Sequence, residues 1–325
     1  MEPLARELEL VELELAALLH HGNGLIGEVC DHLLSAKGKR LRPALLLLTS
    51  DMAGAACREE CVRAAAAVEL VHTATLIHDD TIDASPLRRG VPTVNSLWNE
   101  RVSILMGDYI YSKVFDILAG SSMFGAMGIL AGSTNDMTVS EMLQMEKRGD
   151  LEITECDYMS IIDGKTASLI AAACEIGAME GGCHDGEAEI FSAFGRQVGL
   201  AFQIADDILD LVADGAALGK PRGSDLKQGN VTLPLIAALR NAPEPDRRRM
   251  RELASARFRG EGIFTGDEGT QELVHLVEKH GGVKYAREEA ARCVRKAKSH
   301  LLRFGHSPSR EALLSAADFA AGRSC

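Results

Sequence analysis

The sequence predicts an all-α protein, and two observations support this fold class. Residues that favour helices, such as alanine, leucine, glutamate, arginine and methionine, are abundant, whereas aromatic residues make up only 4% of the chain and β-branched runs are sparse. Apolar residues also recur with a helical period in almost every segment. The expected helices lie near residues 4–20, 24–36, 41–53, 58–83, 92–118, 134–148, 154–178, 185–212 and 231–241, with several more towards the C-terminus.

Local breaks separate these helices along the chain. Gly22-Asn23-Gly24 ends the first helix, and Pro43 stands in the first turn of the third, where proline is acceptable. Further breaks lie at 84–90, 181–182, 219–229 and 257–269, of which the last is expected to be the most mobile loop. None of them resembles a linker between domains. We therefore expect residues 1–325 to form one domain, which is long enough to bury a sizeable core.

Composition and charge exclude several classes of function. The formal net charge of −12 at pH 7 is the opposite of the basic surface that nucleic-acid phosphates require, so no nucleic-acid partner is expected. No apolar run approaches the roughly 18 residues of a membrane span. The eight cysteines follow no disulfide framework or CxxC spacing, and the acidic N-terminus lacks the basic start of a signal peptide. These features predict a cytoplasmic protein with reduced thiols.

Two copies of one aspartate pattern, DDxxD, stand 127 residues apart, each at the end of an apolar stretch with helical character. The first runs from Asp79 to Asp83 and the second from Asp206 to Asp210. Positions i and i+4 of a helix project from the same face, so each pattern presents a pair of carboxylates. Clustered carboxylates resist joint ionisation unless a cation compensates, and oxygen ligands suit magnesium. A single copy could be a solvated acidic face, whereas two copies favour a metal site.

Basic residues that could receive a phosphate-rich ligand flank the two aspartate patterns. Residues 38–43 form a basic turn that opens a helix, and a helix N-terminus favours phosphate. The candidate cations are Lys39, Arg40, Arg42, Arg88, Arg89, Lys165 and Lys220. Although Gly164-Lys165-Thr166 looks like the end of a nucleotide-binding P-loop, Met159 stands where that motif needs glycine, so we do not expect a P-loop.

Together these residues resemble the trans-polyprenyl diphosphate synthase family over nearly the whole chain. The ordered matches are GKRLRP at 38–43, VHTATLIHDDTID at 71–83, LRRG at 87–90, GDYIYSKVF at 107–115, DGKTASL at 163–169, FQIADDILD at 202–210 and GKPRGSDLKQG at 219–229. The resemblance implies a bundle of long antiparallel helices around a deep central cavity, usually in a homodimer. It also implies an enzyme that elongates an allylic diphosphate with isopentenyl diphosphate.

The resemblance further implies a role for each matching residue. Three Mg²⁺ ions per active site would be held by Asp79, Asp83, Asp206, Asp207 and Asp210, and Asp80 would support this cage. The predicted catalytic residues are Asp79, Asp80, Asp83, Lys165, Thr166, Gln203 and Asp206. The diphosphate of isopentenyl diphosphate would be bound by Lys39, Arg42, His72 and Arg89, with Arg40 as a helper. The residues that would face the allylic substrate are Arg88, Lys165, Thr166, Gln203 and Lys220.

In this family, the residues four and five positions before the first aspartate pattern point into the tunnel for the growing tail. Here they are Thr75 and Ala74, about 6–8 Å deeper along the helix than Asp79. Their small side chains would leave the tunnel open, and the pattern lacks the two-residue insertion of many bacterial short-chain enzymes. We therefore expect a product of C35 to C50, centred on C40, for quinone side chains. Its apolar tail would favour transient membrane contact during release.

Three alternatives remain open at this point. The enzyme could be a short-chain synthase with a C15 to C20 product, or the chain could be a noncatalytic subunit of a heterodimeric synthase. Two intact aspartate patterns favour an active subunit over the latter. A terpene cyclase or head-to-head synthase would share the aspartates but would have no reason to hold a second diphosphate with GKRLRP and RRG. Product analysis separates these alternatives, because only elongation requires isopentenyl diphosphate.

Overall fold

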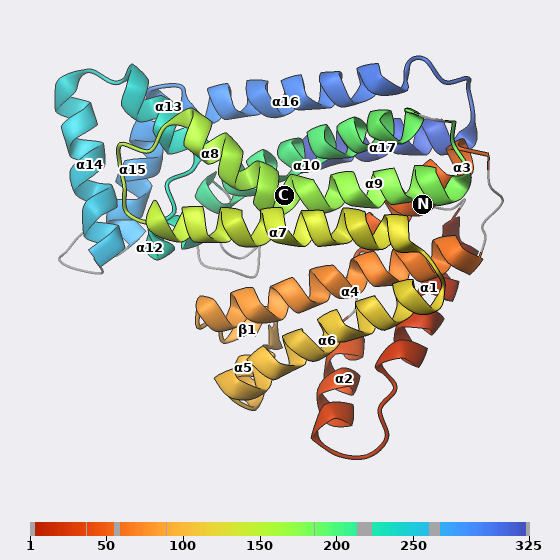
Figure 1. Cartoon of the computed structure of the whole chain (residues 1–325). Coiled ribbons are helices and arrows are strands. Elements are labelled where there is room, and N and C mark those ends of the chain that lie inside the picture. The colour runs from red at the N-terminus through yellow and green to blue at the C-terminus, as the bar shows by residue number, and fades with distance from the viewer. Residues whose placement is uncertain are drawn as a thin grey trace. The chain divides into compact units, whose positions relative to one another are not determined.

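The computed structural model describes residues 4–36, 38–54, 59–88, 90–184, 186–212, 223–259 and 267–322. The all-α prediction is confirmed, because helices dominate the described residues and the strands there are two short segments, β1 (Leu87–Arg88) and β2 (Val91–Pro92) (Figure 1). The α-helices are α1 (Ala5–Leu19), α2 (Leu25–Ser35), α3 (Leu41–Met52), α4 (Glu59–Ile82), α5 (Val94–Leu97), α6 (Glu100–Gly120), α7 (Phe124–Glu146), α8 (Glu155–Ile162), α9 (Ser168–Gly181), α10 (Glu187–Val212), α12 (Ser224–Gln228), α13 (Leu233–Asn241), α14 (Glu244–Arg259), α15 (Asp267–Lys279), α16 (Gly282–Leu301) and α17 (Pro308–Ala321).

Most predicted helices agree with the observed ones to within a few residues, but two boundaries differ. The helix expected at 92–118 is divided into α5 and α6, because the side chain of Asn99 accepts the backbone N–H of Val102 at 3.0 Å and caps a new helix. Helix α7 begins at Phe124 rather than near 134. Its first turns contain three glycines, each of which lowers helix propensity by about 1 kcal/mol. The sequence pattern therefore did not predict a helix in this segment.

The helix expected at 154–178 contains a π-helical turn, η2 (Asp163–Ala167), between α8 and α9. The backbone N–H of Ser168 donates to the carbonyl of Asp163, five residues back, as a π-helix requires. Single π-helical turns inside α-helices occur frequently at functional sites. Nothing in the sequence pattern predicted this turn.

The described chain forms two compact units, each assembled from separate segments. The first comprises Met1–Asn135, Leu169–Gly195 and His300–Leu314. The second comprises Asp136–Ser168, Arg196–Ser299 and Ser315–Cys325. Every boundary between the units falls within a helix rather than at a linker. The expectation of a single domain therefore stays a prediction.

Helix α4 is packed against several helices of the first unit. It contacts α1, α3 and α6, and it ends with the first aspartate pattern. Four consecutive alanines, residues 64–67, are at most 1% exposed, so the neighbouring helices approach α4 closely on several sides. The packing of this alanine-rich helix fixes the position of the carboxylates at its end.

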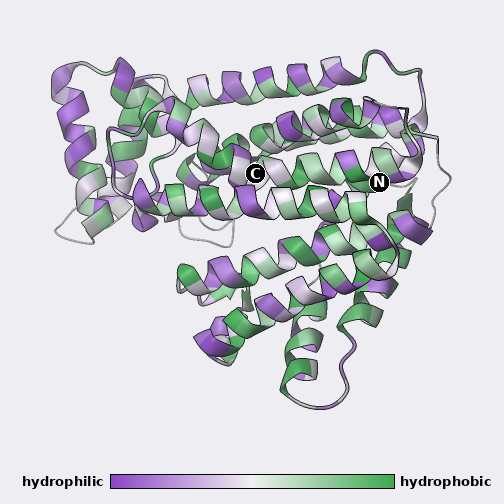
Figure 2. Ribbon diagram, in the orientation of Figure 1, coloured by the Kyte–Doolittle hydropathy of each residue, from purple (hydrophilic) through white to green (hydrophobic). Residues whose placement is uncertain are grey.

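In the second unit, α13 packs against α8, α14 and α15. Helix α8 begins with a capping box, in which the side chains of Thr154 and Asp157 each accept the other residue's backbone N–H. Figure 2 shows that α14 is largely hydrophilic, and its arginines pair with acidic residues, as in Arg249 with Glu272.

The segment predicted to be mobile, 257–269, lies partly outside the described residues, so its mobility stays a prediction. No described helix is both long and apolar enough to cross a membrane.

Candidate active site

The first aspartate pattern forms the last turn of α4. The backbone N–H of Asp83 donates to the carbonyl of Asp79 at 2.9 Å, so the helical geometry continues through the pattern. Asp79 and Asp83 are both half-buried and one turn apart. Asp80 is only 7% exposed, and its two carboxylate oxygens accept Nε of Arg88 at 2.7 and 2.9 Å. The structure thus places the predicted allylic-site residue Arg88 directly on Asp80.

The second aspartate pattern lies in the last turns of α10. Asp206 is exposed, whereas Asp207 is 5% exposed and accepts two hydrogen bonds. One comes from the hydroxyl of Tyr158 at 2.6 Å and the other from Nε2 of Gln203 at 2.7 Å. Burial raises the pKa of the Asp207 carboxyl above its ordinary value, while these two hydrogen bonds favour its ionised form.

Asp210 holds the start of α12 through backbone amide groups. Its two carboxylate oxygens accept the backbone N–H groups of Ser224 at 3.2 Å and Asp225 at 3.0 Å, at the start of α12. A carboxylate at this position satisfies amide groups that a helix start leaves without a partner. Asp210 therefore anchors the described end of the segment 219–229, in addition to its predicted role at the metal.

The two aspartate patterns share one arrangement of exposed and buried carboxylates. The first aspartate of each, Asp79 or Asp206, is more exposed than the second. The second, Asp80 or Asp207, is buried and fixed by side-chain donors from elsewhere in the fold. Each buried carboxylate thus ties a neighbouring donor to its pattern. The more exposed carboxylates are the ones that can reach a ligand.

The donors of both patterns fit magnesium, which prefers carboxylate oxygens and usually keeps further positions for water or phosphate. Within the described residues, no three acidic, histidine or cysteine side chains form a ready-made metal cluster. The assignment of Asp79, Asp83, Asp206, Asp207 and Asp210 to the metal stays a prediction.

Lys165 and Thr166 are carried by the π-helical turn η2. The ammonium group of Lys165 pairs with Glu141 of α7 at 2.5 Å. The hydroxyl of Thr166 donates to Oε1 of Gln203 on α10 at 2.7 Å. The structure therefore brings together two of the residues predicted to face the allylic substrate, Thr166 and Gln203, which are 37 positions apart in the sequence.

Replacing Gly164 with alanine is expected to lower the stability of the protein. An added Cβ atom would overlap Oγ of Ser140 and lie 2.8 Å from the backbone oxygen of Asp136, both on α7. The hydroxyl can rotate away but the helix backbone cannot, so we expect the free energy of unfolding to fall by about 1–3 kcal/mol. Urea unfolding measures this loss. Gly120→Ala is the control, since nothing lies within 4 Å of its added Cβ. Equal stability of the two variants would contradict the close approach of η2 to α7.

The basic turn at 38–43 opens α3, as predicted, but its central residue has partners of its own. Arg40 adopts a left-handed backbone conformation with φ of 49°. Its guanidinium donates to Glu12 of α1 at 2.5 and 3.1 Å and to the buried Glu69 of α4 at 2.7 Å. Arg40 therefore ties the turn to α1 and α4. The prediction that it also helps to bind substrate is not tested by these contacts.

The residues predicted to set chain length lie on the inner part of α4. Ala74 is fully buried, at 0% exposure. Thr75 is part-buried, and its hydroxyl shares a hydrogen bond with that of Tyr111 on α6 at 3.0 Å. His72 lies half-buried on the same helix. Tyr111 was not among the predicted site residues, although it stands inside the matched GDYIYSKVF segment.

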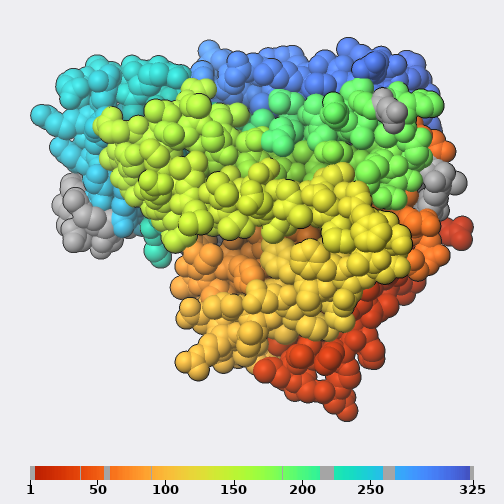
Figure 3. All heavy atoms as spheres, viewed as in Figure 1, coloured from red at the N-terminus to blue at the C-terminus, as the bar shows by residue number. Residues whose placement is uncertain are grey.

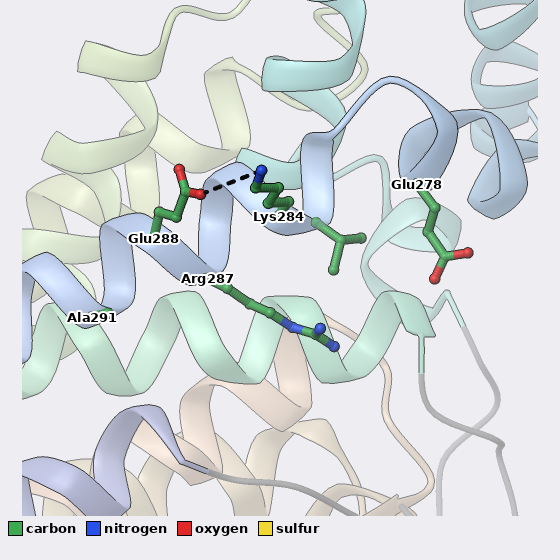
Figure 4. A pocket seen from close by; sticks show the side chains of 6 residues that line it. Glu278, Lys284, Arg287, Glu288 and Ala291 are labelled. Atoms are coloured by element: carbon green, nitrogen blue, oxygen red, sulfur yellow. Dashed lines mark ion pairs between the residues drawn. The ribbon is translucent and has the colours of Figure 1, made fainter.

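Two predicted substrate-binding residues, Arg89 and Lys220, lie outside the described residues. A shallow pocket of about 450 Å³ lies on α15 and α16 (Figure 4). Its lining residues are far in the sequence from both aspartate patterns. Its charged lining includes Glu278, Arg287 and the pair of Lys284 with Glu288. It contains none of the predicted site residues.

Comparisons with known proteins match almost the whole chain. A family model described as "Polyprenyl synthetase" matches residues 23–264. The chain is 40% identical to a short chain isoprenyl diphosphate synthase of Methanothermobacter thermautotrophicus, over 89% of this chain and 87% of that protein. It is 33% identical to the octaprenyl diphosphate synthase of Escherichia coli, over 95% of this chain and 94% of that protein.

Two further matches bear on assembly and fold. The chain is 37% identical to component 2 of a heptaprenyl diphosphate synthase of Geobacillus stearothermophilus, over 85% of this chain and 90% of that protein. Its structure is similar to the crystal structure of a polyprenyl synthase from Caulobacter crescentus CB15 complexed with calcium and isoprenyl diphosphate. The TM-score is 0.91 and the identity 33%, over 99% of this chain and 96% of that chain.

Proposed function

This chain belongs to the polyprenyl synthetase family and is a trans-prenyltransferase, and we propose that it elongates farnesyl or geranylgeranyl diphosphate to a long-chain product. One observation carries the proposal for the site. Each of the two aspartate patterns keeps its first carboxylate more exposed while its second is buried and hydrogen-bonded. That arrangement suits two sets of metal ligands held on rigid helix ends.

In the proposed mechanism, Asp79, Asp83 and Asp206 would hold magnesium for the allylic diphosphate, with three ions per active site. When bound, the metal supplies positive charge that stabilises the diphosphate as the allylic carbon–oxygen bond breaks. Arg88 and Lys165 add cationic donors to the same leaving group. No side-chain nucleophile takes part, since the double bond of isopentenyl diphosphate attacks the allylic cation.

The second substrate is assigned to the basic turn and to its neighbours. Lys39, Arg42, His72 and Arg89 bind the diphosphate of isopentenyl diphosphate in this proposal. The proton lost after the new bond forms passes to the released diphosphate. Thr166 and Gln203 steady the cation with the dipoles of their oxygen atoms, without trapping it covalently. The hydrogen bond between these two side chains supports this pairing.

A product of C35 to C50, centred on C40, is proposed from the small side chains at positions 74 and 75. The similarity to the octaprenyl diphosphate synthase of Escherichia coli supports this length. A short-chain product of C15 to C20 is the second candidate. Two observations favour it, namely the similarity to the short-chain synthase and the aromatic ring of Tyr111 beside Thr75. A quinone side chain as the end use stays part of the long-chain proposal.

We propose a homodimer, because large apolar side chains are exposed on neighbouring helices of the first unit. On α6, Leu105 is 66% and Phe115 is 52% exposed, and Phe124 at the start of α7 is 66% exposed. These helices, drawn in yellow, reach the molecular surface in Figure 3. The similarity to one component of a heptaprenyl synthase keeps a heteromeric partner as the alternative. Cytoplasmic location and transient membrane contact stay predictions.

The test is to incubate the purified chain alone with Mg²⁺, isopentenyl diphosphate and farnesyl diphosphate and to size the products by mass spectrometry. We expect polyprenyl diphosphates of 35 to 50 carbons. Products no longer than 20 carbons would support the short-chain candidate. Activity that appears only with a second protein would support the heteromer. Consumption of the allylic substrate without isopentenyl diphosphate would overturn the elongation proposal.

A further inference from the structure

A chain of hydrogen bonds, buried at one end and part-buried at the other, links α8, α10 and η2 in the second unit. The hydroxyl of Tyr158 donates to Oδ2 of Asp207, and Oδ1 of the same carboxylate accepts Nε2 of Gln203. Oε1 of Gln203 then accepts the hydroxyl of Thr166. All three distances are 2.6 or 2.7 Å. Tyr158 is 3% exposed and belongs to none of the motifs singled out in the sequence.

The carboxylate of Asp207 sets the direction of this chain. The amide of Gln203 turns its nitrogen towards Oδ1 of Asp207 and its oxygen towards Thr166, while Oδ2 of Asp207 accepts the hydroxyl of Tyr158. The proton of the Thr166 hydroxyl is in turn committed to that amide oxygen. The remaining lone pairs of both oxygen atoms are then the groups that can face a neighbouring cation. The opposite direction would instead present an O–H dipole with its positive end outward.

The elements that carry the chain are held closely together. Gly199 lies one turn before Gln203 on α10, and an added Cβ there would lie 2.5 Å from Cα of Ala167 in η2. The close approach of α10 to η2 therefore brings Gln203 within reach of Thr166. The capping box at Thr154 fixes the start of α8, one turn before Tyr158. Rigid helices thus determine the distances between all four side chains.

We propose that Tyr158 is a positioning residue, which holds Asp207 in place so that Gln203 and Thr166 present their oxygen lone pairs to the allylic cation. The inference deepens the proposed function and rests on it. Tyr158 touches neither substrate nor metal in this proposal and acts only through Asp207 and Gln203. Two donors on Asp207 fix both of its oxygens, whereas one donor would leave the carboxylate free to rotate. Preorganised dipoles stabilise a developing charge without reorganising during the reaction.

The test is the variant Tyr158→Phe, which removes only the hydroxyl. We expect kcat to fall on the order of tenfold, as for the loss of one hydrogen bond to a charged group. The KM values of both substrates and the magnesium concentration at half-maximal activity are expected to stay within twofold. The matched control is Tyr285→Phe, because the hydroxyl of Tyr285 donates to Glu155 on α8 at 2.7 Å and lies outside the chain. The control should keep wild-type kcat.

A double-mutant cycle separates positioning from a general structural role. In a Gln203→Met background, Tyr158→Phe should change kcat by less than twofold, because the group that it positions is already absent. Thr166→Val gives a second cycle from the other end of the chain, in which a smaller coupling is expected because Gln203 is still present. Additive losses in both cycles, or a wild-type kcat in Tyr158→Phe, would overturn the inference. A wild-type protein that makes no elongated product would instead overturn the proposed function itself.

Discussion

Replacing Asp79 or Asp206 with alanine is expected to abolish turnover at saturating magnesium. Each variant removes the more exposed carboxylate of one pattern, which in the proposed mechanism holds the metal against the leaving diphosphate. Loss of the charge stabilisation that the metal supplies should lower kcat by about 10³-fold or more. Steady-state assays with farnesyl diphosphate and isopentenyl diphosphate, titrated with magnesium, measure the effect.

Matched controls for these variants lie on the same two helices. Glu60 in the first turn of α4 and Glu189 in the first turn of α10 are exposed carboxylates with no predicted role. Their replacement by alanine should leave kcat within about twofold, since surface changes of this kind shift stability by only about 0.5 kcal/mol. Near-normal turnover in both aspartate variants would refute the mechanism.

Replacing Ala74 with tyrosine is expected to shorten the product. The side chain at this position would enter the tunnel that receives the growing tail, about one to two helical turns below Asp79, and a ring there would form a floor. We expect the main product to fall from C35–C50 to C20 or shorter. Mass spectrometry of the reaction products gives the distribution directly, and a ratio of isopentenyl to farnesyl units follows from the same spectra.

The full burial of Ala74 makes a folding control necessary for this variant. Inserting a ring into a packed site costs about 1–3 kcal/mol, so thermal unfolding should be compared with that of the wild type. Ala74→Ser changes the volume little and should leave the product unchanged. An unchanged product distribution from a folded and active Ala74→Tyr variant would refute the argument for an open tunnel.

Local patterns in the sequence were enough to predict the helix ends that carry the aspartates. Asp79 and Asp83 are separated by one turn, and such a relation depends only on helical geometry. The partners of Asp80 and Asp207 could not be predicted in this way. Tyr158 stands 49 positions from Asp207, and nothing in the local sequence marks it as the donor. The sequence thus predicted where the carboxylates lie on their helices, while packing decides which donors fix them.

The partners of the cationic residue Arg40 could not be predicted from the local sequence either. Its place between Lys39 and Arg42 suggested a phosphate ligand, because all three cations share one short turn. Its observed partners, Glu12 and Glu69, lie 28 and 29 residues away in the sequence. A part-buried arginine with two carboxylate partners satisfies its charge within the fold. The charge of a residue therefore does not show whether it anchors the turn, as Arg40 does, or is available to bind a ligand.

The π-helical turn at 163–167 makes the length of this segment as important as its composition. A π-helical turn holds one residue more than an α-helical turn, and each residue of an α-helix advances by about 100° around the axis. Loss of a single residue here would restore ordinary helix and turn Lys165 and Thr166 away from Glu141 and Gln203. Among homologues, sequence alignments across this segment should therefore tolerate exchanges of side chain far more readily than gaps.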